Sequence, residues 1–332
     1  MPKYSVIVPV YNRIDEVDDL LCSLTRQTMT DFEVIIVEDG STVPCRETVE
    51  KYAGKLDAHY YFKDNEGRSI ARNYGIQRSK GDYLIFFDSD CVIPPDYFAI
   101  LDARLTETPL DAFGGPDAAH ESFTPTQKAI SFAMTSFLTT GGIRGGKIQM
   151  EKFVPRSFNM GYSREVYDRV GGFREMFSED IDMSTRIRQA GFSIGLIRDA
   201  AVYHKRRIDF RKFWRQVHIF GRSRITLKLL YPDSLKLVHT LPALAVIIGV
   251  VFVALGIFVS PWWLLPIGIY LVALFFAALL STKSFNIALR AVPASVVQIA
   301  GYGTGFIRAY FTKIILGRGR DINEEIAARK GK

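Results

Sequence analysis

Two aspartates separated by one residue are the first candidates for chemistry in this sequence. Asp88 and Asp90 directly follow the apolar run 83–87. On an extended backbone, residues two apart point to the same side, so these carboxylates would repel each other unless a cation lay between them. A divalent ion such as Mg²⁺ or Mn²⁺ would satisfy both and keep positions open for phosphate oxygens. The alternative is an acidic turn that caps the next helix.

Two further groups of polar residues could bind a ligand. Glu38 and Asp39 end the apolar run 32–37, where a carboxylate could accept a hydrogen bond from a base N–H or a ribose hydroxyl. The alternative is turn chemistry, because Asp-Gly is a common turn pair. Arg68 and Arg72 lie near the start of an expected helix, an arrangement suited to a diphosphate. The alternative is a solvated basic helix face.

An acidic pair and a histidine complete the set of candidates. Glu179 and Asp180 open an expected helix, where they either cap its N-terminus or supply a general base that deprotonates an attacking hydroxyl. His204 ends a late expected strand. Its neutral ring could bind a metal ion, or the residue could belong to a basic cluster beside the membrane.

The elements that position these residues alternate along the first 90 residues. Apolar runs separated by helical stretches predict parallel strands in a doubly wound α/β sheet, which binds ligands beyond the carboxyl ends of its strands. The expected strands are 4–10, 32–37, 59–62 and 83–87, and the expected helices are 14–27 and 68–79. Three strand ends therefore deliver Tyr11-Asn12, Glu38-Asp39 and Asp88 with Asp90 to one edge.

Composition narrows the class of protein. The 332 residues are 48% hydrophobic and 23% charged, which excludes disordered and collagen-like chains. Three cysteines without CxxC spacing exclude a disulfide framework or a zinc knuckle and favour a reducing compartment. Much of the net charge of +7 falls in residues 204–228, just before an apolar segment. That placement indicates the cytoplasmic side of a membrane span, and no nucleic-acid-binding motif is present.

The C-terminal third differs from the rest of the chain. Residues 241–259 and 262–280 are apolar enough to form two transmembrane helices, while 291–307 contains Pro293 and several glycines and stays ambiguous. The stretch 208–231 predicts an amphipathic helix that lies either on the bilayer or against other helices. We expect a catalytic domain over 1–207, an interfacial helix and linker over 208–235, two transmembrane helices over 236–282, and a membrane-associated segment with a basic tail over 283–332.

Taken together, these signals resemble a known family. The chain is similar to membrane-anchored, non-processive family 2 glycosyltransferases of the GT-A fold over about residues 3–230. The motifs that carry the resemblance are SVIVPVYNR at 5–13, VIIVEDGS at 34–41, NEGRSIARNYG at 65–75, GDYLIFFDSD at 81–90, FNMGYSREVYDRVGGF at 158–173 and SEDIDMSTRIRQAG at 178–191.

The resemblance implies a role for each candidate. Asp180, within the pair formed with Glu179, is the implied catalytic base. The implied ligands of Mg²⁺ or Mn²⁺ are Asp88, Asp90 and His204. The implied nucleotide-sugar-binding residues are Pro9, Tyr11, Asn12, Glu38, Asp39, Arg68, Arg72, Asp88 and Ser89.

The implied reaction is a metal-dependent, inverting transfer of one hexose-type sugar from a nucleotide sugar, with UDP favoured, to a hydroxyl. Processive relatives carry a QxxRW motif, whereas Gln216 here begins QVHIF, which favours addition of a single sugar. We expect the acceptor to be a lipid-linked glycan or a glycolipid, and we expect a role in polysaccharide biosynthesis. The protein should contact membrane lipids and have no nucleic-acid partner. It should be a multi-pass protein of the cell (inner) membrane with its catalytic domain on the cytoplasmic side. The alternatives are a polyprenyl-phosphate glycosyltransferase and an inactive nucleotide-sugar-binding scaffold.

Overall fold

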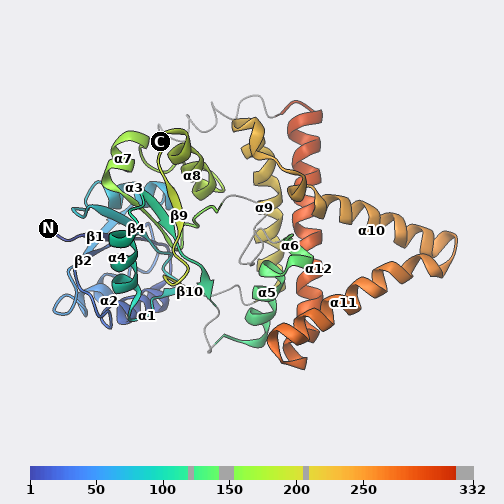
Figure 1. Cartoon of the computed structure of the whole chain (residues 1–332), viewed down its shortest axis with the longest axis horizontal. Helices are drawn as coiled ribbons and strands as arrows, with labels where there is room; N and C mark the ends of the chain where they lie inside the picture. The colour runs from blue at the N-terminus through green and yellow to red at the C-terminus, as the bar shows by residue number, and fades with distance from the viewer. Residues whose placement is uncertain (119–122, 142–152, 205–208, 319–332) are drawn as a thin grey trace. The chain divides into compact units, whose positions relative to one another are not determined.

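The computed structural model describes residues 1–118, 123–141, 153–204 and 209–318, and the chain divides into two compact units (Figure 1). Of the described residues, the first unit, called the α/β unit, comprises 1–118 and 153–204. The second, called the helical unit, comprises the described residues 123–141 and 209–318.

The α/β unit is built on a seven-stranded, mostly parallel sheet. Its strand order is β3-β2-β1-β4-β8-β6-β9, and β8 alone runs antiparallel to its neighbours. The strands are β1 (Tyr4–Val10), β2 (Phe32–Asp39), β3 (Ala58–Lys63), β4 (Tyr83–Phe86), β6 (Ala112–Gly114), β8 (Met160–Ser163) and β9 (Ile194–Leu196). The expected mostly parallel α/β sheet is confirmed.

Helices cover both faces of this sheet, which explains why its strands are continuous apolar runs. In β1, Val6 and Val8 pack with Leu20 on one face, while Ile7 packs with Ile76 on the other. Because side chains alternate along a strand, both faces are buried only when a helix layer lies on each side. The helices of this unit are α1 (Ile14–Leu24), α2 (Arg46–Glu50), α3 (Arg68–Ile76), α4 (Tyr97–Glu107), α7 (Arg164–Val170) and α8 (Glu179–Gln189).

A second, three-stranded sheet lies in the same unit. It has the order β5-β10-β7, formed by β5 (Cys91–Val92), β7 (Asp117–Ala118) and β10 (Val202–His204). In this sheet His204 pairs directly with Cys91, next to Asp90. The late strand expected from the sequence therefore returns to the end of β4.

The helical unit is organised around its longest helix, α12 (Phe285–Ala309), which includes the segment that the sequence left ambiguous. This helix packs most extensively against α5 (Pro125–Thr135), α9 (Phe210–Leu230), α10 (Leu241–Phe258) and α11 (Leu265–Thr282). Short elements complete the unit: α6 (Phe137–Thr140), η1 (Pro232–Ser234), η2 (Leu237–His239), η3 (Pro261–Leu264) and η4 (Tyr310–Ile315).

Two features of this unit bear on the sequence-based division. Residues 123–141 fell within the expected catalytic domain, yet they group with the helical unit, because Ile130 and Ala133 pack with Phe213 and Ala294. The apolar stripe of α9 also has a partner within the chain, since Phe213 and Val217 are fully buried beside α12. Contact between α9 and a bilayer stays a prediction for its remaining faces.

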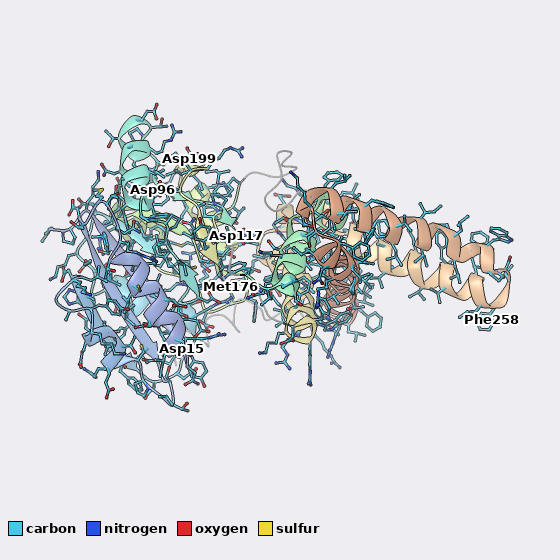
Figure 2. All side chains as sticks on the ribbon, turned by 90° about the horizontal axis from the view of Figure 1, so that it is seen from below. Asp15, Asp96, Asp117, Met176, Asp199 and Phe258 are labelled. Atoms are coloured by element: carbon cyan, nitrogen blue, oxygen red, sulfur yellow. The ribbon has the colours of Figure 1, made fainter. Side chains whose placement is uncertain are left out.

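Helices α10 and α11 form the apolar hairpin of the helical unit, with Phe258 near its tip (Figure 2). The windows Leu241–Phe258 and Pro261–Thr282 have mean hydropathies of 2.8 and 2.4, and only 11% of each is buried. By length and composition, both could cross a bilayer.

The close approach of α9 and α12 depends on glycine and can be tested. A Cβ on Gly305 would lie 2.1 Å from the backbone oxygen of His218, so Gly305→Ala must push the two helices apart. Overpacking of this kind costs about 1–3 kcal/mol. We expect a lower melting temperature for the full chain in detergent, measured by tryptophan fluorescence. Gly249→Ala in α10 is the matched control, because nothing lies within 4 Å of its Cβ. Equal melting temperatures for the two variants would contradict this packing.

Candidate functional site

The loops after β1 and β2 meet at the carboxyl edge of the large sheet. Asn12 adopts a left-handed backbone conformation (φ 53°), which asparagine tolerates better than most residues. Its N–H donates to Ser41 Oγ (2.7 Å), and its Oδ1 accepts from the N–H and the hydroxyl of Thr42 (both 2.9 Å). Asn12 thus ties two strand ends together, and it leaves the side chain of Tyr11 half exposed beside the partly buried Pro9.

Asp39, at the end of β2, is held by three donors. Its Oδ1 accepts from Lys63 Nζ (2.8 Å) and from the N–H of Glu66 (3.0 Å), and its Oδ2 accepts from the N–H of Gly67 (2.9 Å). Burial alone would lower the pKa of Lys63, but its hydrogen bonds to Asp39 and Glu66 outweigh burial and raise that pKa. A carboxylate offers about four acceptor positions, so one remains for a ligand.

Glu38, beside Asp39 in the sequence, faces the protein interior. It is fully buried and accepts hydrogen bonds from Ser41, from the N–H of Cys45 (2.7 Å) and from the hydroxyl of Tyr60 (3.2 Å). Burial and the Glu38 charge together raise the pKa of Tyr60 well above its usual value. These contacts give Glu38 a role in the loop after β2, and its contact with a nucleotide stays a prediction.

Arg72 joins three elements of the site. Although its side chain is 0% exposed, its Nη2 lies 2.7 Å from Asp88 Oδ1 and its Nη1 lies 3.0 Å from Glu179 Oε1. The other oxygen of Glu179 pairs with Arg68 Nη2 at 2.8 Å. The N-terminal part of α3, the end of β4 and the start of α8 are therefore linked by ion pairs. The sequence placed Arg72 near the nucleotide, but nothing in its pattern revealed this link.

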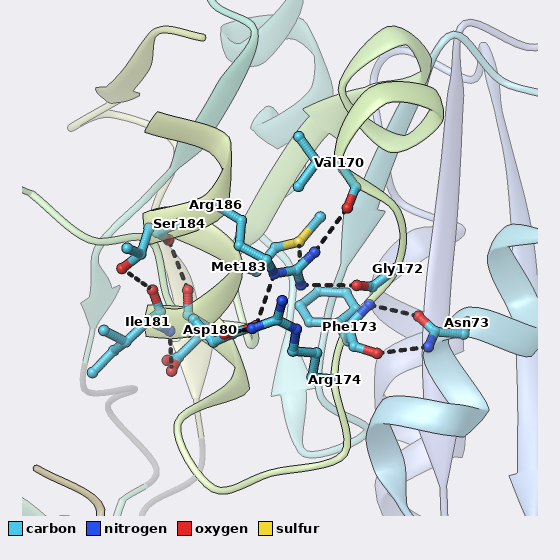
Figure 3. A network of polar contacts seen from close by, with 12 residues as sticks. Asn73, Val170, Gly172, Phe173, Arg174, Asp180, Ile181, Met183, Ser184 and Arg186 are labelled. Carbon is cyan, nitrogen blue, oxygen red and sulfur yellow. Dashed lines mark hydrogen bonds and ion pairs between the residues drawn. The ribbon is translucent and has the colours of Figure 1, made fainter. Parts of the chain in front are cut away.

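The residues around Asp180 fix the start of α8 (Figure 3). Asp180 Oδ1 accepts from the N–H of Ile181 (2.8 Å), and Asp180 Oδ2 lies 3.4 Å from Arg156 Nη1. The preceding loop is held by Arg186, which donates to the carbonyl oxygens of Val170 and Gly172. The Asp180 side chain keeps 14% exposure, against 2% for Glu179. Of this acidic pair, Asp180 is the more accessible member.

The loop before α8 is also bound to α3. Asn73 donates to the carbonyl oxygen of Phe173 and accepts from its N–H, both at 2.8 Å (Figure 3). The guanidinium of Arg72 lies over the Phe173 ring, 5.5 Å from its centre. Both α3 and the loop that leads into Asp180 are thereby held in one arrangement.

Asp90 and His204 form the part of the site that could hold a metal ion. Asp90 Oδ1 lies 3.1 Å from His204 Nε2, and with the sulfur of Cys91 these ligand atoms lie within 4.8 Å of one another. Phe158 stacks on the His204 ring, with centres 4.6 Å apart. A carboxylate oxygen suits Mg²⁺ or Mn²⁺, and a neutral imidazole is the commonest metal ligand, so Asp90 and His204 could hold a divalent ion.

The residues next to Asp90 in the sequence make other contacts. Asp88 lies outside the cluster and pairs with Arg72 instead, while Ser89 between the two aspartates is buried. The Cys91 thiol donates to the carbonyl oxygen of Phe158, and burial raises its pKa well above the usual value. Sequence reasoning missed Lys63 and Arg156, because Lys63 ends an edge strand and Arg156 lies in a stretch without periodicity.

The sequence matches a known protein family over about half of its length. Residues 5–171, just over half of the chain, match the model of the family described as Glycosyl transferase family 2. The chain belongs to this family. Its relatives include the glycosyltransferase AglE of Haloferax volcanii, 26% identical over 75% of this chain and 81% of AglE. They also include the uncharacterized glycosyltransferase EpsJ of Bacillus subtilis, 29% identical over 60% of this chain. The match covers 57% of EpsJ, and only 13% of a similar uncharacterized glycosyltransferase of Rickettsia bellii.

The fold also agrees with a solved structure. The mannosyltransferase PcManGT of Pyrobaculum calidifontis, determined with GDP-Man and Mn²⁺, superposes with a TM-score of 0.58 at 18% identity. The match covers 94% of this chain and 88% of that one. The expected GT-A fold, followed by a C-terminal helical region with two candidate apolar spans, is confirmed.

The two arginines that share Glu179 provide a matched pair for a stability test. Arg72→Met takes a fully buried cation away from both the buried Glu179 and the partly exposed Asp88, so we expect it to cost about 3–5 kcal/mol even though Arg68 still pairs with Glu179. Arg68 is 49% exposed, and we expect Arg68→Met to cost about 1 kcal/mol or less. Thermal unfolding of the full chain in detergent measures both. A melting temperature for Arg72→Met equal to that of Arg68→Met would contradict the linking role of Arg72.

Proposed function

We propose that this protein is an inverting glycosyltransferase that moves one hexose-type sugar from a nucleotide sugar, with UDP favoured, to a hydroxyl of a membrane-associated acceptor. One observation carries the proposal. Arg72 joins the end of β4 to the start of α8, so the candidate metal ligands and the candidate base belong to one rigid edge. Such an edge is where open α/β sheets bind their ligands.

The donor nucleotide has a suitable surface on this edge. Asp39 has about one acceptor position left for a base N–H. The exposed ring of Tyr11, next to Pro9, can pack on the flat base, with Asn12 and Glu38 holding the two loops. The half-exposed Arg68 lies in the first turn of α3, where N–H groups and a guanidinium favour a phosphate.

The departing diphosphate needs its charge stabilised. Asp90 and His204 would hold a Mg²⁺ or Mn²⁺ ion, with Asp88 and Ser89 beside them. When bound, such an ion supplies Lewis-acid stabilisation of the negative charge on the leaving group. Asp88, paired with the buried Arg72, is held at the neighbouring position.

Asp180 is the proposed general base. Its carboxylate accepts the proton of the acceptor hydroxyl as that oxygen attacks the anomeric carbon. The bond to the diphosphate breaks on the opposite side, and its electrons leave with the nucleotide, so the configuration inverts. Glu179 has both oxygens engaged by Arg68 and Arg72, and we assign it the positioning of Asp180 rather than proton transfer.

The acceptor is proposed from the helical unit. Two helices long and apolar enough to span a bilayer follow the catalytic part of the chain, which supports a protein of the cell membrane that modifies a lipid-linked glycan or a glycolipid. The basic segment before them supports a cytoplasmic catalytic domain, the side on which Lys and Arg accumulate.

Replacing the proposed base separates proton transfer from binding. We expect Asp180→Asn to lower the turnover number about 10²- to 10⁴-fold, because an amide cannot take the proton, while the affinity for the nucleotide stays within about twofold. Transfer kinetics and nucleotide calorimetry on the full chain measure the two effects. Asp199→Asn, an exposed aspartate paired with Arg104, is the control. Turnover above a third of the wild-type value would contradict the proposal and favour a lipid-phosphate acceptor, which hardly needs a base.

The class of acceptor can be tested with labelled donor. We expect the full chain in detergent, given a membrane lipid extract, to place the labelled sugar in material that partitions into organic solvent. Label that mild acid releases as a monosaccharide would indicate a glycosyl phosphate, whereas label that is released within an oligosaccharide, or that stays on the lipid, would indicate transfer to a hydroxyl. Equal transfer to soluble sugars without lipid would contradict a membrane-associated acceptor.

A further inference from the structure

A second group of potential metal ligands lies at the other edge of the large sheet. Glu33 is the second residue of β2, Asp57 directly precedes β3, and His59 is the second residue of β3. Glu33 and Asp39 are separated by six residue steps along β2, about 20 Å at 3.3 Å per residue. This group is therefore distinct from the candidate donor site.

The buried carboxylate of Glu33 has one oxygen engaged and one open. Its side chain is 1% exposed. Oε1 accepts from Ser5 Oγ (2.7 Å) and from the N–H of Lys80 (2.5 Å). Oε2 is buried, and within the described parts of the chain it has no hydrogen-bond partner. A buried carboxylate oxygen without a partner is costly, so a cation beside it would be stabilising.

The geometry around Glu33 Oε2 suits a bound ion better than a direct hydrogen bond. His59 Nε2 lies 3.9 Å from Glu33 Oε2, which is too long for a hydrogen bond, and 3.0 Å from Asp57 Oδ1. Two ligands of a tetrahedral ion at about 2.0–2.1 Å are roughly 3.3 Å apart, between these two values. The three potential ligand atoms all lie within 4.8 Å of one another. Nε2 is itself buried and has no hydrogen-bond partner among the residues that the structure describes.

We propose that Glu33, Asp57 and His59 bind a divalent transition-metal ion, with Zn²⁺ as the best match. One imidazole nitrogen and two carboxylate oxygens suit Zn²⁺ better than Mg²⁺, which prefers oxygen ligands. Asp57 is 61% exposed, so the ion enters from solvent and keeps water at its remaining position. The site has a structural role, because it fastens the edge strand β3 to β2. The proposal does not depend on the sugar-transfer chemistry.

The experiment measures the stoichiometry and affinity of Zn²⁺ binding to the full chain in detergent. Protein stripped with EDTA is titrated with Zn²⁺ alone by calorimetry, in the wild-type and Asp90→Ala backgrounds, because the donor side also holds potential ligands. In both backgrounds we expect His59→Gln to remove one equivalent of bound Zn²⁺ or to weaken the affinity for that ion at least about tenfold. Replacing even a residue that only supports a metal ligand weakens metal binding by about tenfold or more. Asp57→Asn should act in the same direction, and the exposed Asp96→Asn should change nothing.

Melting temperatures distinguish a loss of zinc binding from a loss of folding. We expect Zn²⁺ to raise the melting temperature more in the Asp90→Ala protein than in Asp90→Ala with His59→Gln, because a ligand stabilises only the state that binds it. In EDTA, the wild type and His59→Gln should melt at similar temperatures. Zinc stoichiometry and affinity unchanged by His59→Gln and Asp57→Asn would overturn the proposal.

Discussion

A cation with no access to water lies at the centre of the candidate donor site. The guanidinium of Arg72 is completely buried, and two carboxylates compensate its burial because it donates to Asp88 and Glu179 at the same time. Each carboxylate comes from a different element, so the end of β4 and the start of α8 must keep a fixed distance from α3. The bonds of Asn73 and Arg186 to the loop before α8 reinforce that arrangement.

The same constraint separates the roles of Glu179 and Asp180. Glu179 has both oxygens engaged by Arg68 and Arg72 and its side chain is 2% exposed, whereas the Asp180 side chain is 14% exposed and carries the proposed proton transfer. Adjacent residues of the same charge can therefore serve different purposes, because Glu179 holds the start of α8 in place while Asp180 stays accessible.

The sequence predicted the sheet well because its strands are buried on both faces, which makes each of them a continuous apolar run. It also predicted which residues reach the carboxyl edge, since parallel strands end there. Contacts between distant segments could not be predicted. The pairing of β5 with β10 brings His204 beside Asp90, Arg156 reaches Asp180 from an irregular stretch, and the apolar stripe of α9 is covered by α12. The family resemblance suggested a metal role for His204, but only the fold supplies its distance from Asp90.

The most direct test of the account is release of nucleotide from a panel of UDP- and GDP-sugars by the full chain in detergent. The reaction is followed with Mn²⁺, with Mg²⁺ and with EDTA, for the wild type and for Asp90→Asn. We expect release from one donor that is lost in EDTA and restored by the ion. Asp90→Asn should reduce this release at least about 100-fold, because the charge of the leaving diphosphate would no longer be stabilised. The proposed function would be contradicted if no nucleotide sugar, and neither UDP nor GDP, bound to the protein with or without the ions.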